Sequence, residues 1–300
     1  MLDSSKNIVN AFTIDVEDYF QVSAFEPYID RASWEILPRR VTRNTNLILE
    51  MLGEQEVKAT FFVLGWVAQR HPELIRAIAD GGHEVASHGF SHIRIGNQTP
   101  EQFRADITDT KNLLEDISST AVTGFRAASF SVVRDTMWAT TILKEVGYTY
   151  SSSVYPVHHD LYGIPDAPRF AFRHAESGLL EVPITTLPFG GRNMPFGGGG
   201  YFRLFPYSLS KWAFNQVNSI EKRPAVFYCH PWEIDPGQPR QAGLRFKARF
   251  RHYHNLTRMK SRLEHLLADF EWSRMDEVFS AERMRKAPEW TAPSTLSASN

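Results

Sequence analysis

Apolar and polar residues alternate in blocks along the first half of the chain, and the blocks predict strands and helices in turn. Short apolar runs at 10–14, 59–64, 84–86, 122–125 and 148–150 are typical of buried strands. Helical spacing or helix-terminating residues mark the stretches between them, over 42–52, from Pro72 to Gly81-Gly82, over 100–117 and over 133–146. This strand–helix rhythm predicts an α/β fold with a parallel sheet or barrel.

The second half of the chain is less regular. It contains two long loops, at 155–173 and 190–200, a strand at 225–229 and an amphipathic helix at 256–270. No repeat and no clear linker divides the core, so we expect a single domain over 1–280. The Pro-, Ala- and Ser-rich end predicts a flexible tail within 281–300.

Composition narrows the class of protein. The chain has 300 residues, 42% of them hydrophobic, which can supply a large core. Its 33 basic and 34 acidic residues nearly cancel, which argues against a protein that coats nucleic acid. A lone Cys229 excludes an intramolecular disulfide. The N-terminus lacks the features of a signal peptide, and no apolar run is long enough for a transmembrane helix. We therefore expect a cytoplasmic or peripheral location, with a periplasmic one still compatible.

Polar residues stand directly after several predicted strands. In parallel α/β folds, functional groups gather at the carboxyl ends of strands. The residues in this position are Asp15, His88, Arg126, Ser151 and His230.

Two histidines and an acidic cluster form the most informative pattern. His88 and His92 are four residues apart, and with one carboxylate they provide the ligand set of an open catalytic zinc site. Asp15 and Glu17 point to the same side of an extended chain, so one can bind metal while the other takes a proton from water. Asp18 is a spare carboxylate for either role. The alternatives are surface or capping histidines and an acidic loop or helix start. The pattern favours a metal-assisted hydrolase.

Four motifs occur in order along the chain: Phe-Thr-Ile-Asp15-Val-Glu17-Asp, Ser-His88-Gly-Phe-Ser-His92, Gly-Phe-Arg126-Ala-Ala-Ser-Phe and Cys-His230-Pro-Trp. With them the chain resembles the polysaccharide deacetylases of the NodB-homology type (carbohydrate esterase family 4), over roughly residues 8–280. The stretches Asp-Val-Glu-Asp-Tyr-Phe-Gln-Val, Tyr-Gly-Ile-Pro-Asp-Ala-Pro-Arg and His-Pro-Trp-Glu-Ile-Asp-Pro look like the branch found with exopolysaccharide and exosortase loci.

The resemblance implies a distorted (β/α) barrel and a bound divalent metal, Zn²⁺ first, with Co²⁺, Mn²⁺ and Ni²⁺ as alternatives. It implies removal of N-acetyl groups from a polysaccharide or its precursor. Carried over by position, the catalytic base is Asp15, its partner is Arg126, the general acid is His230, and the metal histidines are His88 and His92. The expected partner is an N-acetylated glycan, with peripheral contact to an exopolysaccharide assembly system and with no nucleic acid.

Three residues depart from the family pattern. Val16 separates two acids that are usually adjacent, which moves the metal carboxylate to Glu17, with Asp18 as the alternative. Ala128 replaces a proline that is usual in the arginine motif, and we expect a looser loop there. Ser151 replaces an aspartate, which puts some of the activity in doubt.

Two rival functions stay open. One is a related amide hydrolase acting on a small cyclic or ureide substrate, and the other is a catalytically weak glycan-binding protein. Without the other motifs, Arg126 also fits a structural ion pair and His230 a buried core histidine.

Three further stretches carry weaker signals. We expect Gly197–Gly200 to form a flexible rim loop over the sugar groove. The groove residues expected from the first long loop are Tyr155, His158, His159 and Asp160. The basic run 245–262 suits an anionic glycan or a membrane surface, although such runs are usually solvated helix faces with their aromatics packed inward.

Overall fold

The structure is a computed structural model that describes residues 8–159 and 162–293. Its strands are β1 (Val9–Val16), β2 (Thr60–Val63), β3 (Glu84–Ser87), β4 (Gly124–Phe125), β5 (Tyr150–Ser151), β6 (Phe172–His174), β7 (Leu180–Glu181), β8 (Thr186–Phe189), β9 (Arg192–Pro195), β10 (Val226–Cys229), β11 (Glu271–Ser273) and β12 (Glu289–Trp290). Its α-helices are α1 (Val41–Glu54), α2 (Gly65–Arg70), α3 (Pro72–Asp80), α4 (Pro100–Ser118), α5 (Trp138–Val146), α6 (Gly199–Leu204), α7 (Tyr207–Asn215), α8 (Phe246–Tyr253), α9 (Leu256–Asp269) and α10 (Met275–Val278).

One mostly parallel sheet organises the molecule, which confirms the predicted α/β class. The strand order is β10-β1-β2-β3-β4-β5-β7-β6-β12, and β11 also pairs with β1. The pairs from β10 through β5 are parallel, whereas β6 and β7 are antiparallel. β1 is buried along almost its whole length, as expected for a parallel strand that is covered on both faces.

The sheet curls back on itself. After β7 the chain turns toward β10, where the Thr185 N–H donates to the Val226 carbonyl at 3.3 Å and the Tyr228 N–H donates to the Gly197 carbonyl at 2.8 Å. No pairing between strands of the described residues closes the ring. The fold is therefore a distorted barrel whose last side is completed by irregular chain.

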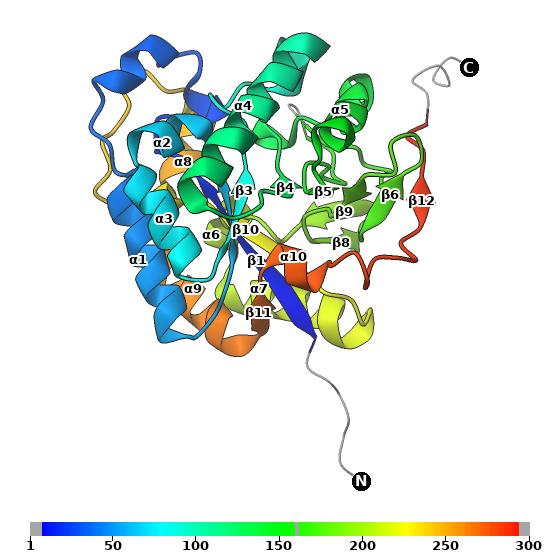
Figure 1. The fold of residues 1–300 in the computed structure, drawn as a ribbon. Coiled ribbons are helices and arrows are strands. Elements are labelled where there is room, and N and C mark those ends of the chain that lie inside the picture. The colour runs from blue at the N-terminus through cyan, green and yellow to red at the C-terminus, as the bar shows by residue number, and fades with distance from the viewer. Residues whose placement is uncertain (1–7, 160–161, 294–300) are drawn as a thin grey trace.

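Helices cover the outside of this barrel (Figure 1). α4 packs against α2, α3 and α5 in one layer over the strands of the first half. Local sequence fixes its start, because Thr99 and Gln102 form a reciprocal capping box and Pro100 takes the first helical position. In the described part of the chain, no helix combines the length and the apolar composition needed to cross a bilayer.

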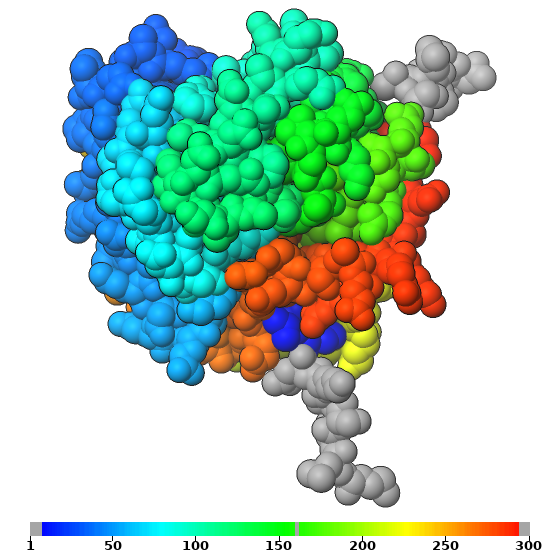
Figure 2. All heavy atoms as spheres, viewed as in Figure 1, coloured from blue at the N-terminus to red at the C-terminus, as the bar shows by residue number. Residues whose placement is uncertain are grey.

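The C-terminal region covers the end of the barrel where the strands begin. Figure 2 shows residues of α10 and the following segment, in orange and red, over the blue start of β1. The Met275 N–H donates to the Thr60 hydroxyl at 2.7 Å, which fixes α10 to the first residue of β2.

The stretch 281–300, expected to be a flexible tail, contains one short strand. β12 pairs with β6, and the Trp290 ring packs against Phe172 with ring centroids 5.1 Å apart. A two-residue strand is too brief to show a period in the sequence, and the flexibility of the tail stays a prediction. Residues 294–300 lie outside the described residues.

Candidate active site

The residues predicted from strand ends meet at one edge of the barrel. Asp15 lies in β1, and Glu17, His88 and His230 directly follow β1, β3 and β10. These four side chains line one pocket of about 240 Å³. Parallel strands bring their carboxyl ends together, which places these four side chains at the same edge.

Glu17, His88 and His92 form a compact group of metal-ligating atoms. One ligand atom from each lies within 4.8 Å of the others, and all three residues are buried. The His92 Nε2 is 3.0 Å from the Glu17 Oε2. The His88 Nδ1 lies 2.8 Å from the Arg126 carbonyl. Because a carbonyl oxygen only accepts, Nδ1 donates there, and Nε2 is the atom that keeps a lone pair.

This group fits a divalent cation by its chemistry. The Glu17 Oε2 is buried but has no hydrogen-bond partner among the described residues, which is costly for a carboxylate oxygen. Burial lowers the pKa of His88, and it lowers the pKa of His92 well below its usual range, so both imidazoles are neutral. Two neutral imidazoles and one carboxylate form the donor set of catalytic zinc.

Asp18, the alternative carboxylate, is occupied elsewhere. Its Oδ2 accepts from the backbone N–H groups of Arg40 and Val41, at 2.7 and 3.0 Å, at the start of α1. Its Oδ1 accepts from the Tyr19 N–H at 2.9 Å. Asp18 therefore caps a helix, and of the two candidates only Glu17 reaches the histidines.

Asp15 pairs with a fully buried arginine. The Arg126 Nη1 donates to the Asp15 Oδ1 at 2.5 Å and to the Thr13 hydroxyl at 2.9 Å. The same guanidinium donates to Ser152 and lies over the Phe62 ring, 4.0 Å from its centroid. These contacts hold one oxygen of Asp15 and leave Oδ2 directed toward His230, 4.0 Å from its Nε2.

His230, Glu233 and Arg203 form a series of contacting side chains, here called the relay, which the sequence analysis did not predict. The His230 Nδ1 is 2.6 Å from the Glu233 Oε1, and the Arg203 Nε donates to the Glu233 Oε2 at 2.9 Å. The His230 Nε2 points into the pocket, 3.5 Å from the Glu17 Oε1. The only sequence signal was a glutamate three residues after the histidine, and nothing in the sequence links that glutamate to Arg203.

Neighbouring charges set the pKa of His230. Burial alone would lower the pKa of His230, but the negative charges of Glu17, Glu233 and Asp15 raise that pKa to about 9. Burial raises the pKa of Glu17 to about 7, against the opposing effect of His230. For Glu233, burial acts to raise the pKa, but Arg203 and His230 lower it overall. The relay therefore favours a protonated His230.

The rings of Trp232 and His252 stack next to His230. Trp232 stacks on His230, with ring centroids 5.1 Å apart, and donates its Nε1–H to Glu17 at 3.3 Å. The buried His252 stacks on the other side of Trp232, at 4.2 Å. Trp232 thus fixes both the imidazole plane and the carboxylate.

Two of the glycines in the stretch expected to be a flexible rim pack tightly. A Cβ at Gly197 would lie 2.4 Å from the Val226 carbonyl, and one at Gly199 would lie 2.3 Å from the Glu233 carboxylate. Gly199 also begins α6. Gly197 and Gly199 are therefore needed for close packing, whereas Gly200 has open space around it and lines the pocket.

The first long loop contributes part of what was expected. His159 lines the pocket, next to Tyr162, on which its ring stacks. Tyr155 is buried behind Tyr162, with the two rings parallel and 5.9 Å apart, and His158 is exposed. Asp160 lies outside the described residues.

The two remaining departures from the family pattern are buried. Ser151 donates its hydroxyl to Ser153 at 2.7 Å and does not line the pocket. Ala128 begins a short turn in which Ser129 and Phe130 have φ values of 53° and 51°. The Ser129 hydroxyl lies 2.6 Å from that of Ser23, so the turn is tied to the chain after β1.

Comparisons with known proteins agree with this geometry. The family model described as polysaccharide deacetylase matches residues 32–151, and a domain of unknown function, DUF3473, matches residues 152–280. Residues 32–151 of the chain are therefore similar to polysaccharide deacetylases. This deacetylase region contains His88, His92 and Arg126, while His230 and its relay lie in the second matched region. Strands from both regions pair in one sheet.

Similar proteins carry related names. The chain is 34% identical over 71 residues to a peptidoglycan-N-acetylglucosamine deacetylase of Bacillus cereus, a stretch that is 24% of this chain and 33% of that protein. It is 39% identical over 70 residues to a chitooligosaccharide deacetylase of Rhizobium leguminosarum bv. trifolii, a stretch that is 23% of this chain and 33% of that protein. The chain thus spans about a third of the length of these relatives.

Solved structures share the fold. A structure from Mycobacterium smegmatis, described as a polysaccharide deacetylase, has a TM-score of 0.65 at 19% identity and covers 97% of this chain and 96% of its own. The PuuE allantoinase has a TM-score of 0.59 at 14% identity, covering 95% and 93%. At these identities the likeness establishes the NodB-type fold alone, and the named sequence relatives do not favour the ureide hydrolase.

Proposed function

We propose that this protein is a metal-dependent deacetylase that hydrolyses the N-acetyl group of a polysaccharide or of its precursor. One observation carries the proposal: a single pocket combines the Glu17, His88 and His92 group with the Asp15–Arg126 pair and the His230–Glu233 relay. Amide hydrolysis needs an activated water, a proton acceptor and a proton donor, and these three parts supply them.

Glu17, His88 and His92 would hold the metal ion. A divalent ion at that place would supply Lewis-acid activation of the acetyl carbonyl and of a water molecule. The two-nitrogen, one-oxygen set supports zinc, with cobalt, manganese and nickel as alternatives.

The roles of the other residues follow from their contacts. Asp15 accepts the proton of the attacking water at Oδ2, because Arg126 occupies Oδ1. His230 then donates a proton from Nε2 to the departing amine. Glu233 keeps Nδ1 bonded and so holds the ring with Nε2 toward the pocket.

The walls of the pocket suit a sugar. Phe130, Tyr162, Tyr228 and Trp232 present aromatic rings around the polar group, and neutral sugars bind by such mixed surfaces. We infer that the polymer is an exopolysaccharide, because the motif sequences resemble those of the deacetylases found with exopolysaccharide and exosortase loci. We also infer that the enzyme makes peripheral contact with the exopolysaccharide assembly system.

Metal content and turnover, measured together, test the proposal. His88→Ala should abolish bound metal, measured by mass spectrometry of the purified protein, and hydrolysis of an N-acetylated sugar oligomer. His265→Ala, an exposed histidine on α9, should change neither. Unchanged metal stoichiometry in His88→Ala would reject the metal site. A metal-loaded wild type that binds the oligomer without turnover would favour the glycan-binding rival.

A further inference from the structure

One segment concentrates positive charge in an otherwise neutral protein. From Asp235 to Glu264 the chain has eight Arg and Lys residues between those two acids, and no further Asp or Glu, whereas the net charge of the whole protein is −1. Helix α8 lies within this segment. The basic residues are Arg240, Arg245, Lys247, Arg249, Arg251, Arg258, Lys260 and Arg262.

Two phenylalanines on α8 are exposed to solvent. Phe246 is 84% exposed and Phe250 is 43% exposed, and their rings stack with centroids 6.3 Å apart. The expectation that the aromatics of this run pack inward is therefore wrong for these two, although Tyr253 is half-buried. Exposing two apolar rings to water costs free energy, and a partner that covers the rings would remove this cost.

The phenylalanines point away from the body of the protein and from the pocket. Successive residues of an α-helix are turned by roughly 100°, which puts Phe246 and Phe250 on the side opposite the buried His252. Ala248 and Arg251 lie toward the same side of α8 as His252, and all three line the catalytic pocket. The rings therefore flank the pocket mouth without entering it.

We propose that α8 is a membrane-docking edge for an anionic lipid surface, an inference that goes beyond the proposed activity and does not rest on it. Phe246 and Phe250 enter the interfacial layer, while Arg245 and Arg249, both exposed, contact acidic head groups. An apolar strip with basic flanks is the combination that holds a helix in the plane of a bilayer surface. Docking through α8 would place the catalytic mouth beside the membrane.

Charge and direction favour a lipid surface over two other occupants. A second copy of this chain, packed by two-fold symmetry, would set the basic segment against itself, and like charges would repel. A soluble glycan bound in the pocket would contact the side of α8 that carries Ala248 and Arg251, which leaves the two phenylalanine rings in water.

Vesicle binding tests the proposal with the intact chain. Wild type should co-sediment with vesicles of phosphatidylcholine and phosphatidylglycerol, less with phosphatidylcholine alone, and less at high salt. Phe246→Ser with Phe250→Ser should lower the partition coefficient at least about tenfold. Arg245→Gln with Arg249→Gln should lower it about fivefold for each arginine.

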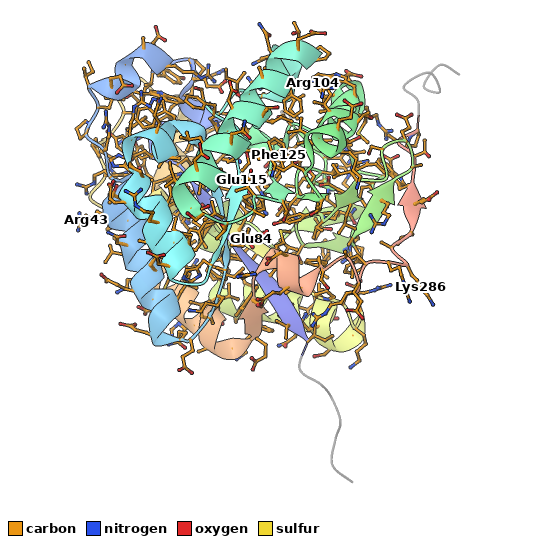
Figure 3. The ribbon with its side chains drawn as sticks, in the orientation of Figure 1. Arg43, Glu84, Arg104, Glu115, Phe125 and Lys286 are labelled. Carbon is orange, nitrogen blue, oxygen red and sulfur yellow. The ribbon has the colours of Figure 1, made fainter. Side chains whose placement is uncertain are left out.

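Matched variants elsewhere on the surface provide the controls. Phe189→Ser removes a phenylalanine that is 73% exposed on β8 and should bind as wild type does. Arg43→Gln with Arg76→Gln removes two exposed arginines, on α1 and α3, and should also bind normally; Arg43 lies at the edge of the molecule in Figure 3. Turnover of a soluble N-acetylated oligomer should be unchanged in the phenylalanine double variant, so a failed docking edge is distinguishable from a failed enzyme.

Three outcomes would overturn the docking edge. The first is wild type that does not bind anionic vesicles. The second is equal binding by wild type and the phenylalanine double variant. The third is a concentration-dependent dimer in sedimentation velocity that the double variant abolishes while vesicles stay unbound.

Discussion

Glu17 and Glu84 are buried carboxylates at opposite ends of the sheet. Glu17 follows the last residue of β1, while Glu84, which Figure 3 labels, is the first residue of β3. Burial raises the pKa of both to about 7. A raised pKa therefore does not by itself distinguish a functional carboxylate from a structural one.

Their hydrogen-bond partners do distinguish them. Glu84 accepts from the Thr60 and Tyr150 hydroxyls, at 2.6 and 2.8 Å, and from the Asp276 N–H at 3.2 Å. These neutral donors join β2, β3, β5 and α10 at the end of the barrel where the strands begin. Glu17 instead has an oxygen without a hydrogen bond from any described residue, and it faces His92 and His230. A satisfied buried carboxylate ties elements together, whereas an unsatisfied one is available for a ligand.

The largest expected effect separates the two acids of the catalytic end. Asp15→Asn should retain bound metal yet lower kcat about 10⁴-fold, because the proton acceptor is lost while Arg126 stays buried. Glu17→Gln should lose the metal itself. Metal analysis and turnover of both variants check this, with Glu84→Gln as a control that keeps both. If Asp15→Asn loses the metal and Glu17→Gln retains it, the two roles are reversed.

Removing the proton donor should have the next largest effect. His230→Ala should lower kcat on an N-acetyl sugar about 10²–10³-fold. The loss should be much smaller on an activated aryl acetate, because a phenolate leaves without needing a proton. Both substrates are assayed with the same enzyme preparation. Equal losses would mean that His230 orients the substrate or supports the structure.

Glu233 acts through His230 and should show a smaller effect. Glu233→Gln should lower kcat about 10–100-fold with little change in KM, because the imidazole loses its orienting partner. Since Glu233 helps to raise the pKa of His230, the alkaline limb of the kcat profile should move to lower pH. Glu221→Gln, in a partly exposed ion pair with Arg169 outside the pocket, should leave the profile unchanged. An unshifted profile in Glu233→Gln would assign Glu233 a packing role alone.

The sequence predicted the end of the barrel that carries the pocket better than the end where the strands begin. The predicted strands of the first half and the strand near 225 carry regular patterns, and Asp15, His88, Arg126 and His230 follow them, so their shared edge could be inferred. β7 and β9 lie in the less regular second half and were not predicted, and β9 falls within the stretch 190–200 that was expected to be a loop. Contacts between distant residues had no local signal at all: Glu233 with Arg203, and Glu84 with Tyr150. Long-range satisfaction of polar groups is decided by the fold and cannot be inferred from spacing.

The smallest expected effect concerns stability rather than turnover. The pKa of Glu84 is about 7 in the folded protein, against 4.5 for the unperturbed group, because burial disfavours its charge. The folded state therefore binds this proton more tightly than the unfolded chain does. The resulting stabilisation is present in full below about pH 4.5 and is lost as the pH rises through about 7.

Glu84→Gln should remove this pH-dependent part. Between about pH 5 and about pH 8, the fall in the free energy of unfolding should be smaller in the variant by on the order of 1–3 kcal/mol. Urea unfolding of both proteins at the two pH values measures it, and Glu50→Gln, at an exposed position on α1, is the matched control. Turnover per folded molecule should be unchanged, because Glu84 lies at the end of the strands away from the pocket. An identical pH dependence in wild type and Glu84→Gln would show that Glu84 does not carry this titration, and the contrast between the two buried glutamates would then rest on their hydrogen bonds alone.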